Sequence, residues 1–108
     1  MNFNEYQERA YTTARFPMID EMGICYPVIG LAGETGEVSE KVKKFFRDGG
    51  DLLKFKQDIT LELGDCMWYI ASIAKLLGIS LQDVAEGNIT KVESRVQRNK
   101  IHGSGDSR

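Results

Sequence analysis

The segment from Leu52 to Leu77 limits the folds open to this chain more than any other feature. It has the pattern of one long helix that Gly78 ends, and its second half, residues 66–74, is apolar on nearly every side. A helix with that pattern is buried around most of its circumference. The remaining helical segments of a 108-residue chain are too few to cover it. We therefore expect an all-α homo-oligomer, a homodimer or homotetramer, that packs this helix at its interface.

Three further segments are predicted to be helical. The first spans about residues 4–16 and ends before Pro17. The second begins near Pro27, a residue that suits the first turn of a helix, and continues to about residue 46. The last opens at a capping sequence and spans about residues 80–99. The pattern predicts a bundle of four helices.

Composition bounds the classes of function. The length is close to the commonest domain size, so we expect one domain over residues 1–108, with residues 100–108 as a mobile Gly- and Ser-rich tail. A formal charge of −2 gives no electrostatic reason to expect a nucleic-acid polymer or a membrane as partner. The first residues lack the basic and apolar regions of a signal peptide, and a cytoplasmic protein is the expectation.

Two carboxylate pairs carry the chemistry. Glu34 and Glu37 lie in the second predicted helix, and Glu62 and Asp65 lie in the third. Residues three apart project from one helix face with their Cβ atoms about 5–6 Å apart, so the members of each pair repel. Two facing helices would bring four carboxylates together, an arrangement that a hard cation stabilises. The sequence therefore predicts a Mg²⁺ site in which Mn²⁺ could substitute.

Three glycines occur at a spacing of three in the second predicted helix, namely Gly30, Gly33 and Gly36. Each costs about 1 kcal/mol of helix stability relative to Ala. Their spacing predicts that another backbone or a ligand comes close to this helix.

Other interpretations of the acidic residues can be compared with a metal site. Lysines could neutralise them in an ion-pair network, and the chain would then be a non-catalytic helical interaction module; the candidates are Lys41, Lys43 and Lys44. Nucleophilic catalysis needs a positioned histidine, and the sole histidine, His102, lies in the tail. A di-iron site needs Glu-x-x-His motifs, which neither pair supplies. Metal-assisted hydrolysis of a phosphoanhydride needs only residue types that are present.

The order of these motifs resembles one enzyme family. Glu34-Thr35-Gly36-Glu37 followed by Glu62-Leu63-Gly64-Asp65, with Tyr69 one turn later, is similar to the MazG-like nucleoside triphosphate pyrophosphohydrolases over residues 26–99. The resemblance implies an all-α enzyme that uses Mg²⁺ to cleave (d)NTPs between the α and β phosphates, giving a nucleoside monophosphate and pyrophosphate. It implies that the catalytic metal ligands are Glu34, Glu37, Glu62 and Asp65. It further implies that the substrate-binding residues are Tyr69, Asn88, Lys91, Arg95 and Lys100.

One position departs from that family pattern. Many members carry a further glutamate, assigned as a general base, where this chain has Gly33. Either water activated by the metal needs no separate base, or another carboxylate such as Glu40 serves. Trp68 likewise has two interpretations, as a stacking partner for a base and as part of the core or the dimer interface. The glycines of the tail could let backbone N–H groups approach a phosphate, or the tail could be disordered.

Overall fold

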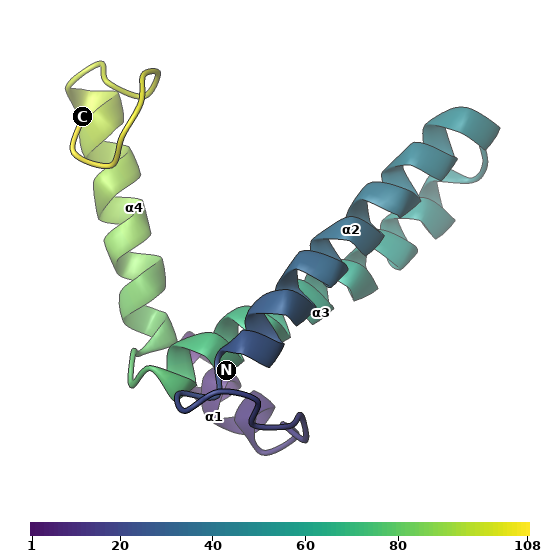
Figure 1. Ribbon diagram of the computed structural model, residues 1–108. Coiled ribbons are helices and arrows are strands. Elements are labelled where there is room, and N and C mark those ends of the chain that lie inside the picture. The colour runs from purple at the N-terminus through teal and green to yellow at the C-terminus, as the bar shows by residue number, and fades with distance from the viewer.

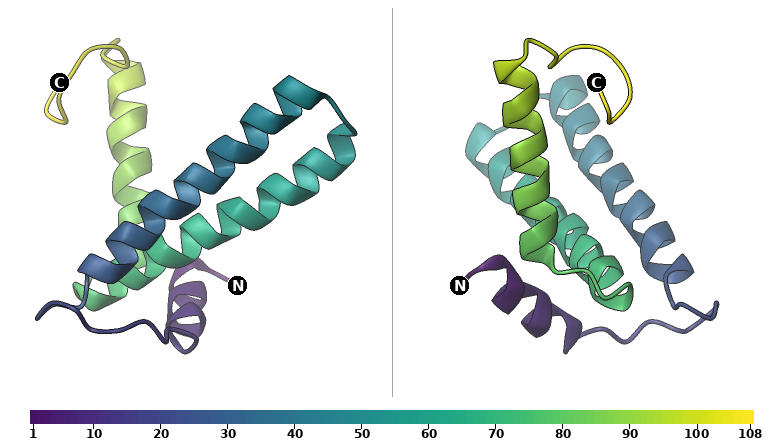
Figure 2. Two further views of the ribbon diagram at one scale, coloured as in Figure 1. Left: turned by 45° about the vertical axis from the view of Figure 1, so that its right-hand side comes forward. Right: turned by 90° about the vertical axis from the view of Figure 1, so that its left-hand side faces the viewer.

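The computed structural model describes residues 1–108 and contains four helices and no strand: α1 (Phe3–Tyr11), α2 (Cys25–Asp48), α3 (Leu52–Leu76) and α4 (Leu81–Gln97). The expected all-α class is confirmed. Figures 1 and 2 show that α2 and α3 form a long antiparallel hairpin, that α1 packs near its base, and that α4 leaves the base and diverges from the hairpin. None of the helices combines the length and the apolar content that crossing a membrane requires.

The hairpin turn aligns α2 with α3. Gly49 and Gly50 have φ angles of 73° and 131°, a region that favours glycine. Asp51 then caps α3, because its carboxylate accepts a hydrogen bond from the first turn of the helix. Close to the turn, the rings of Phe45 and Phe55 stack with centroids 4.2 Å apart. The turn and this stacked pair hold the acidic residues of the two helices face to face.

The first helix ends earlier than the sequence predicts, at Tyr11 instead of Phe16. The hydroxyl groups of Thr12 and Thr13 each donate to the carbonyl three residues back, at 2.6 Å. Such bonds compete with regular helical hydrogen bonds. Thr13 also accepts a hydrogen bond from the indole nitrogen of Trp68 at 2.8 Å. The residues after Tyr11 are therefore used to join the α1–α2 connection to α3.

A small core lies where α1, α3 and α4 meet. Ala10, Ala71 and Leu81 are buried there, and Tyr6 and Trp68 pack against them. These residues come from three helices, so the core fixes the base of the fold and leaves the two arms to extend from it.

Gln7 joins α1 to the turn between α3 and α4. Its side-chain amide is buried, donates to the carbonyl of Ile79 at 2.9 Å and accepts from the backbone N–H of Leu81 at 3.0 Å. Gly78 allows this turn with a φ of 70°. The direction in which α4 leaves the base is therefore set by buried hydrogen bonds.

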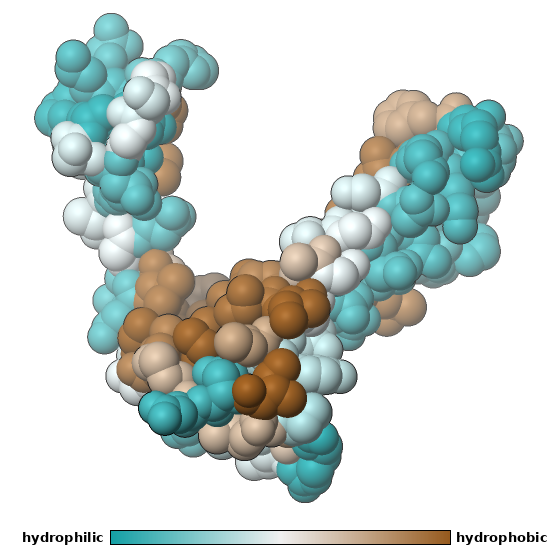
Figure 3. Space-filling model, in the orientation of Figure 1, coloured by the Kyte–Doolittle hydropathy of each residue, from teal (hydrophilic) through white to brown (hydrophobic).

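A single chain leaves much apolar surface open. Its accessible area is 7697 Å², against about 6,100 Å² expected for a compact protein of 12.2 kDa. Its radius of gyration of 16.6 Å compares with about 13 Å for a compact domain of this length. Met67 and Ile70, in the segment predicted to be buried, remain 37% and 41% exposed. Figure 3 shows apolar atoms gathered over the base of the fold, between more hydrophilic arms.

Candidate metal centre

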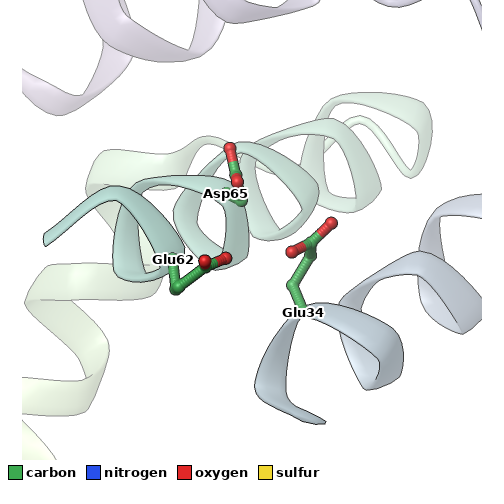
Figure 4. Close-up of side chains that lie close together, drawn as sticks. All are labelled: Glu34, Glu62 and Asp65. Carbon is green, nitrogen blue, oxygen red and sulfur yellow. The ribbon is translucent and has the colours of Figure 1, made fainter. Parts of the chain in front are cut away.

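Three carboxylates from two helices converge on one point. Glu34 projects from α2, and Glu62 and Asp65 project from the facing side of α3 (Figure 4). One oxygen from each carboxylate can be chosen so that all three lie within 4.8 Å of one another. Glu34 and Glu62 are half-buried and Asp65 is exposed, so the site opens to solvent on one side. Glu37, the fourth predicted ligand, lies outside this group and is exposed, one turn further along α2.

The cluster carries an excess of negative charge. Partial burial raises the pKa of Glu34, and the charges of Asp65, Glu62 and Glu37 raise it further. The one ion pair at the cluster joins Lys41 to Glu62, with nitrogen and oxygen 3.8 Å apart. Hard carboxylate oxygens with a net negative charge are the donor set that Mg²⁺ and Mn²⁺ prefer. The residues present therefore fit a divalent cation.

The remaining lysines of the proposed ion-pair network contact a different residue. Lys43 and Lys44 both pair with Glu40, at 2.5 Å and 3.7 Å. The hydrogen bond from Lys43 lowers the pKa of Glu40 and keeps its carboxylate ionised. Glu40 is thus held by two lysines on α2. Gly33, by contrast, faces open space in this chain, so no packing requirement explains the glycine there.

Tyr69 lies one turn beyond Asp65 on the same helix. Its ring packs against Gly30 of α2 so closely that a Cβ atom at position 30 would overlap it. Partial burial raises the pKa of the Tyr69 hydroxyl, and the charges of nearby acidic groups, Glu34 and Asp65 among them, add to the effect. The phenol therefore stays protonated beside the carboxylates and keeps a hydrogen-bond donor there.

Tyr69 belongs to an aromatic cluster that also contains Trp68 and two residues that the sequence did not point to, Phe16 and Tyr26. Trp68 meets it edge to face with centroids 5.0 Å apart, and Phe16 meets Trp68 in the same way at 6.0 Å. Phe16 also stacks on Tyr26 at 5.7 Å. Trp68 packs on the core and donates to a threonine, which matches the structural interpretation of this residue. The connection that carries Phe16 has no helical period, so the sequence does not indicate which way this side chain points. The one weak signal for the pairing of Phe16 with Tyr26 is that each precedes a proline.

The predicted substrate-binding residues beyond Tyr69 lie on the other arm. Asn88, Lys91 and Arg95 belong to α4, and Lys100 follows it. No Cα atom of α4 comes within 8 Å of one in α2. In addition, α4 contacts α3 but diverges from the α2–α3 hairpin, so the structure does not bring these residues to the carboxylate cluster of the same chain (Figure 1).

Comparison with known proteins agrees with the resemblance in the motifs. The MazG nucleotide pyrophosphohydrolase domain matches residues 28–99. The chain is also 40% identical, over 114 aligned positions that cover both proteins completely, to the Gene 37 protein of Mycobacterium phage L5. No solved structure matches the chain significantly. With the family match extending over most of its length, the chain belongs to the MazG nucleotide pyrophosphohydrolase family.

Proposed function

We propose that this protein is a Mg²⁺-dependent pyrophosphohydrolase that cleaves (d)NTPs between the α and β phosphates, with residues 1–108 acting as one MazG-like domain. The observation that carries the proposal is the convergence of Glu34, Glu62 and Asp65 with a single ammonium group nearby. Membership of the family supports the reaction type. An ion-pair network would instead require cations to match the carboxylates in number.

Each side chain has a role in this proposal. Glu34, Glu62 and Asp65 hold the cation, and Glu37, whose charge contributes to the raised pKa of Glu34, is the fourth carboxylate assigned to the set. Mg²⁺ bound there supplies Lewis acidity to a phosphate oxygen and lowers the pKa of a water. Tyr69 donates a hydrogen bond to the nucleotide from beside the cluster.

We also propose that the working unit is a homodimer or homotetramer. The chain exposes about 1,600 Å² more surface than a compact protein of its mass, and a stable interface takes about 800 Å² from each partner. Two adjoining hollows of about 330 and 450 Å³ lie where α4 leaves the base, and both are lined by Phe3 and Gln82. A helix of a second chain bound in these two hollows would cover exposed apolar residues of α3 and α4, such as Met67 and Ile89.

Charge favours a particular arrangement of the two chains. Residues 91–108 carry five Lys or Arg and two Asp or Glu, whereas the cluster on α2 and α3 is acidic. Since α4 diverges from the carboxylates of its own chain, we propose that α4 and the residues after it supply Asn88, Lys91, Arg95 and Lys100 to the site of a partner. The nucleotide would then bind between carboxylates of one subunit and cations of another.

The first experiment is product analysis by ion-exchange chromatography after incubation with a panel of dNTPs and NTPs, with Mg²⁺ and with EDTA. The expected products are monophosphate and pyrophosphate, formed only with the metal. Glu62→Gln and Asp65→Asn should each reduce the rate more than about 100-fold, because even outer partners of metal ligands are worth about 10–100-fold.

Asp58→Asn is the matched control, because this carboxylate lies one turn before Glu62 and pairs with Lys54 instead. It should retain activity. Diphosphate and orthophosphate as products would mean a different phosphohydrolase. If no substrate turns over and Mg²⁺ does not raise the melting temperature, the interaction module becomes the better interpretation.

A further inference from the structure

The chain folds one of its own carboxylates onto two of the cations assigned to the substrate. After α4 the last residues form a loop that bends back beside the end of the helix (Figure 2), and side chains of α4 and Arg98 hold it there. The carboxylate of Asp106 lies 3.2 Å from the ammonium of Lys91 and 3.4 Å from the guanidinium of Arg95. Both cations lower the pKa of Asp106, with Lys91 contributing most. An internal anion therefore occupies the position in which a phosphate is expected.

The two cations hold this loop in different ways. Arg95 is only 6% exposed, and its terminal nitrogen also donates to the backbone carbonyls of Gly105 and Asp106, at 3.4 and 3.0 Å. Lys91 is 39% exposed, and its single partner is the Asp106 carboxylate. Arg95 thus anchors the backbone of the loop, whereas Lys91 is tied only to a side chain that a stronger anion can displace.

The rest of the loop is held through its carbonyl oxygens. The guanidinium of Arg108 donates to the carbonyls of Lys100, Ile101 and Gly105, and Arg98 donates to the carbonyl of Arg108. The Asp106 carboxylate accepts hydrogen bonds only from the side chains of Lys91 and Arg95, and from no backbone N–H of the chain. The Asp106 carboxylate therefore lies against two cations with no backbone donor of its own, so one negative charge faces two positive charges, an environment suited to an anion of higher charge.

We propose that Asp106 is an internal substitute for a substrate phosphate, which a polyphosphate displaces from Lys91 while Arg95 keeps the loop attached. This inference rests on the proposed function, which gives Lys91 its role. The Asp106 side chain is 90% exposed, and exposed ion pairs are weak. A group with several negative charges competes with it successfully, whereas orthophosphate competes poorly. The loop then favours di- and triphosphate chains over ligands that carry a single phosphate.

Binding of inorganic pyrophosphate in EDTA tests the proposal without metal or turnover. Titration calorimetry at low ionic strength should show that Asp106→Asn binds pyrophosphate about two- to fivefold more tightly than the natural chain, the range that one exposed ion pair supplies. Glu93→Gln is the matched control. It removes the same charge from the same stretch, but Glu93 is exposed and forms no ion pair with either cation.

A double-mutant cycle with Lys91→Gln locates the effect. If Asp106 competes for Lys91, the gain from Asp106→Asn disappears in the Lys91→Gln background. Equal affinities for Asp106→Asn and Glu93→Gln, a gain that persists without Lys91, or no pyrophosphate binding by any variant would overturn the proposal. Because these titrations contain no metal, their outcome is independent of whether nucleotides are hydrolysed.

Discussion

The backbone of Gly30 on α2 lies directly against the ring of Tyr69 on α3, with no room for even a methyl group between them. This contact is close to the carboxylates, because Glu34 is one turn from Gly30 and Asp65 is one turn from Tyr69. It therefore sets how closely the two helices approach at the proposed metal site. A side chain at position 30 would move either Tyr69 or the whole of α2.

Gly30→Ala should destabilise the protein by about 1–3 kcal/mol, the usual cost of overpacking a tight contact, despite a helix-propensity gain of about 1 kcal/mol. Urea denaturation in EDTA measures this change. Gly36→Ala is the control, since position 36 faces open space in this chain and the substitution should stabilise by up to about 1 kcal/mol. Equal stabilities for the two variants would show that the contact with Tyr69 is unimportant.

The three glycines of α2, at positions 30, 33 and 36, differ in what lies next to them. Their spacing predicts a close approach of another backbone or a ligand to this helix, and the structure places a neighbour at Gly30 alone among the three. For Gly33 and Gly36 the predicted neighbour, a ligand or another chain, stays a prediction. The repeated glycines identify α2 as the helix that is approached closely. Which glycine is in contact depends on the position of Tyr69 along α3, and the spacing of the glycines does not give that position.

The helical segments, and the position of Glu34 opposite Glu62 and Asp65, followed from local rules of period, capping and turn residues. The position of α4 did not. Its direction depends on Gln7, whose amide bonds to residues more than seventy positions away. The contact between Lys91 and Asp106 depends likewise on the path of an irregular loop. No periodic pattern encodes either relationship.

Glu34→Gln should raise the melting temperature of the metal-free protein at neutral pH. Burial and neighbouring carboxylates raise the pKa of Glu34 in the folded chain. At a pH above the ordinary pKa of 4.5, folding therefore opposes ionisation of this side chain, and the protein loses stability. We expect a gain of about 2–4 °C, since about 1 kcal/mol corresponds to about 4–8 °C in a domain of this size. The gain should shrink below pH 4.5, where the natural side chain is protonated in both states.

The same variant should lose most of the stabilisation by Mg²⁺, because one ligand of the cluster becomes neutral. Scanning calorimetry with EDTA and with Mg²⁺ separates the two effects. Glu21→Gln, a change at an exposed carboxylate in the α1–α2 connection, controls for net charge. A variant that melts below the natural chain in EDTA would contradict repulsion within the cluster.

Asp106 should titrate below its ordinary pKa of 3.8. Because Lys91 and Arg95 lower this pKa in the folded chain, the contact stabilises the docked loop above pH 3.8 and is lost as the pH falls through the lowered value. NMR titration of the side-chain carboxyl carbon measures it. Lys91→Gln should move the pKa back toward 3.8, and Lys54→Gln, which alters the far end of the hairpin, should leave it unchanged.

Mixing two variants that are each expected to be inactive tests whether the site is shared between chains. Glu62→Gln removes a carboxylate from the cluster, and Lys91→Gln removes a cation from α4. If Lys91 acts in the site of a partner, half of the exchanged dimers contain one site with both residues natural and one site with neither. The mixture should therefore recover about a quarter of the natural activity.

Chain exchange by joint refolding, followed by product analysis with Mg²⁺, provides the measurement. A mixture of two variants that lie on the same side of the site, Glu62→Gln and Asp65→Asn, is the control and should recover nothing, since every site then lacks a carboxylate. Should the first mixture also stay inactive while each variant folds and assembles, Lys91 would act within its own chain. The α4 arm would then have to close onto its own α2–α3 hairpin, and the buried hydrogen bonds of Gln7 that now direct it away would have to break.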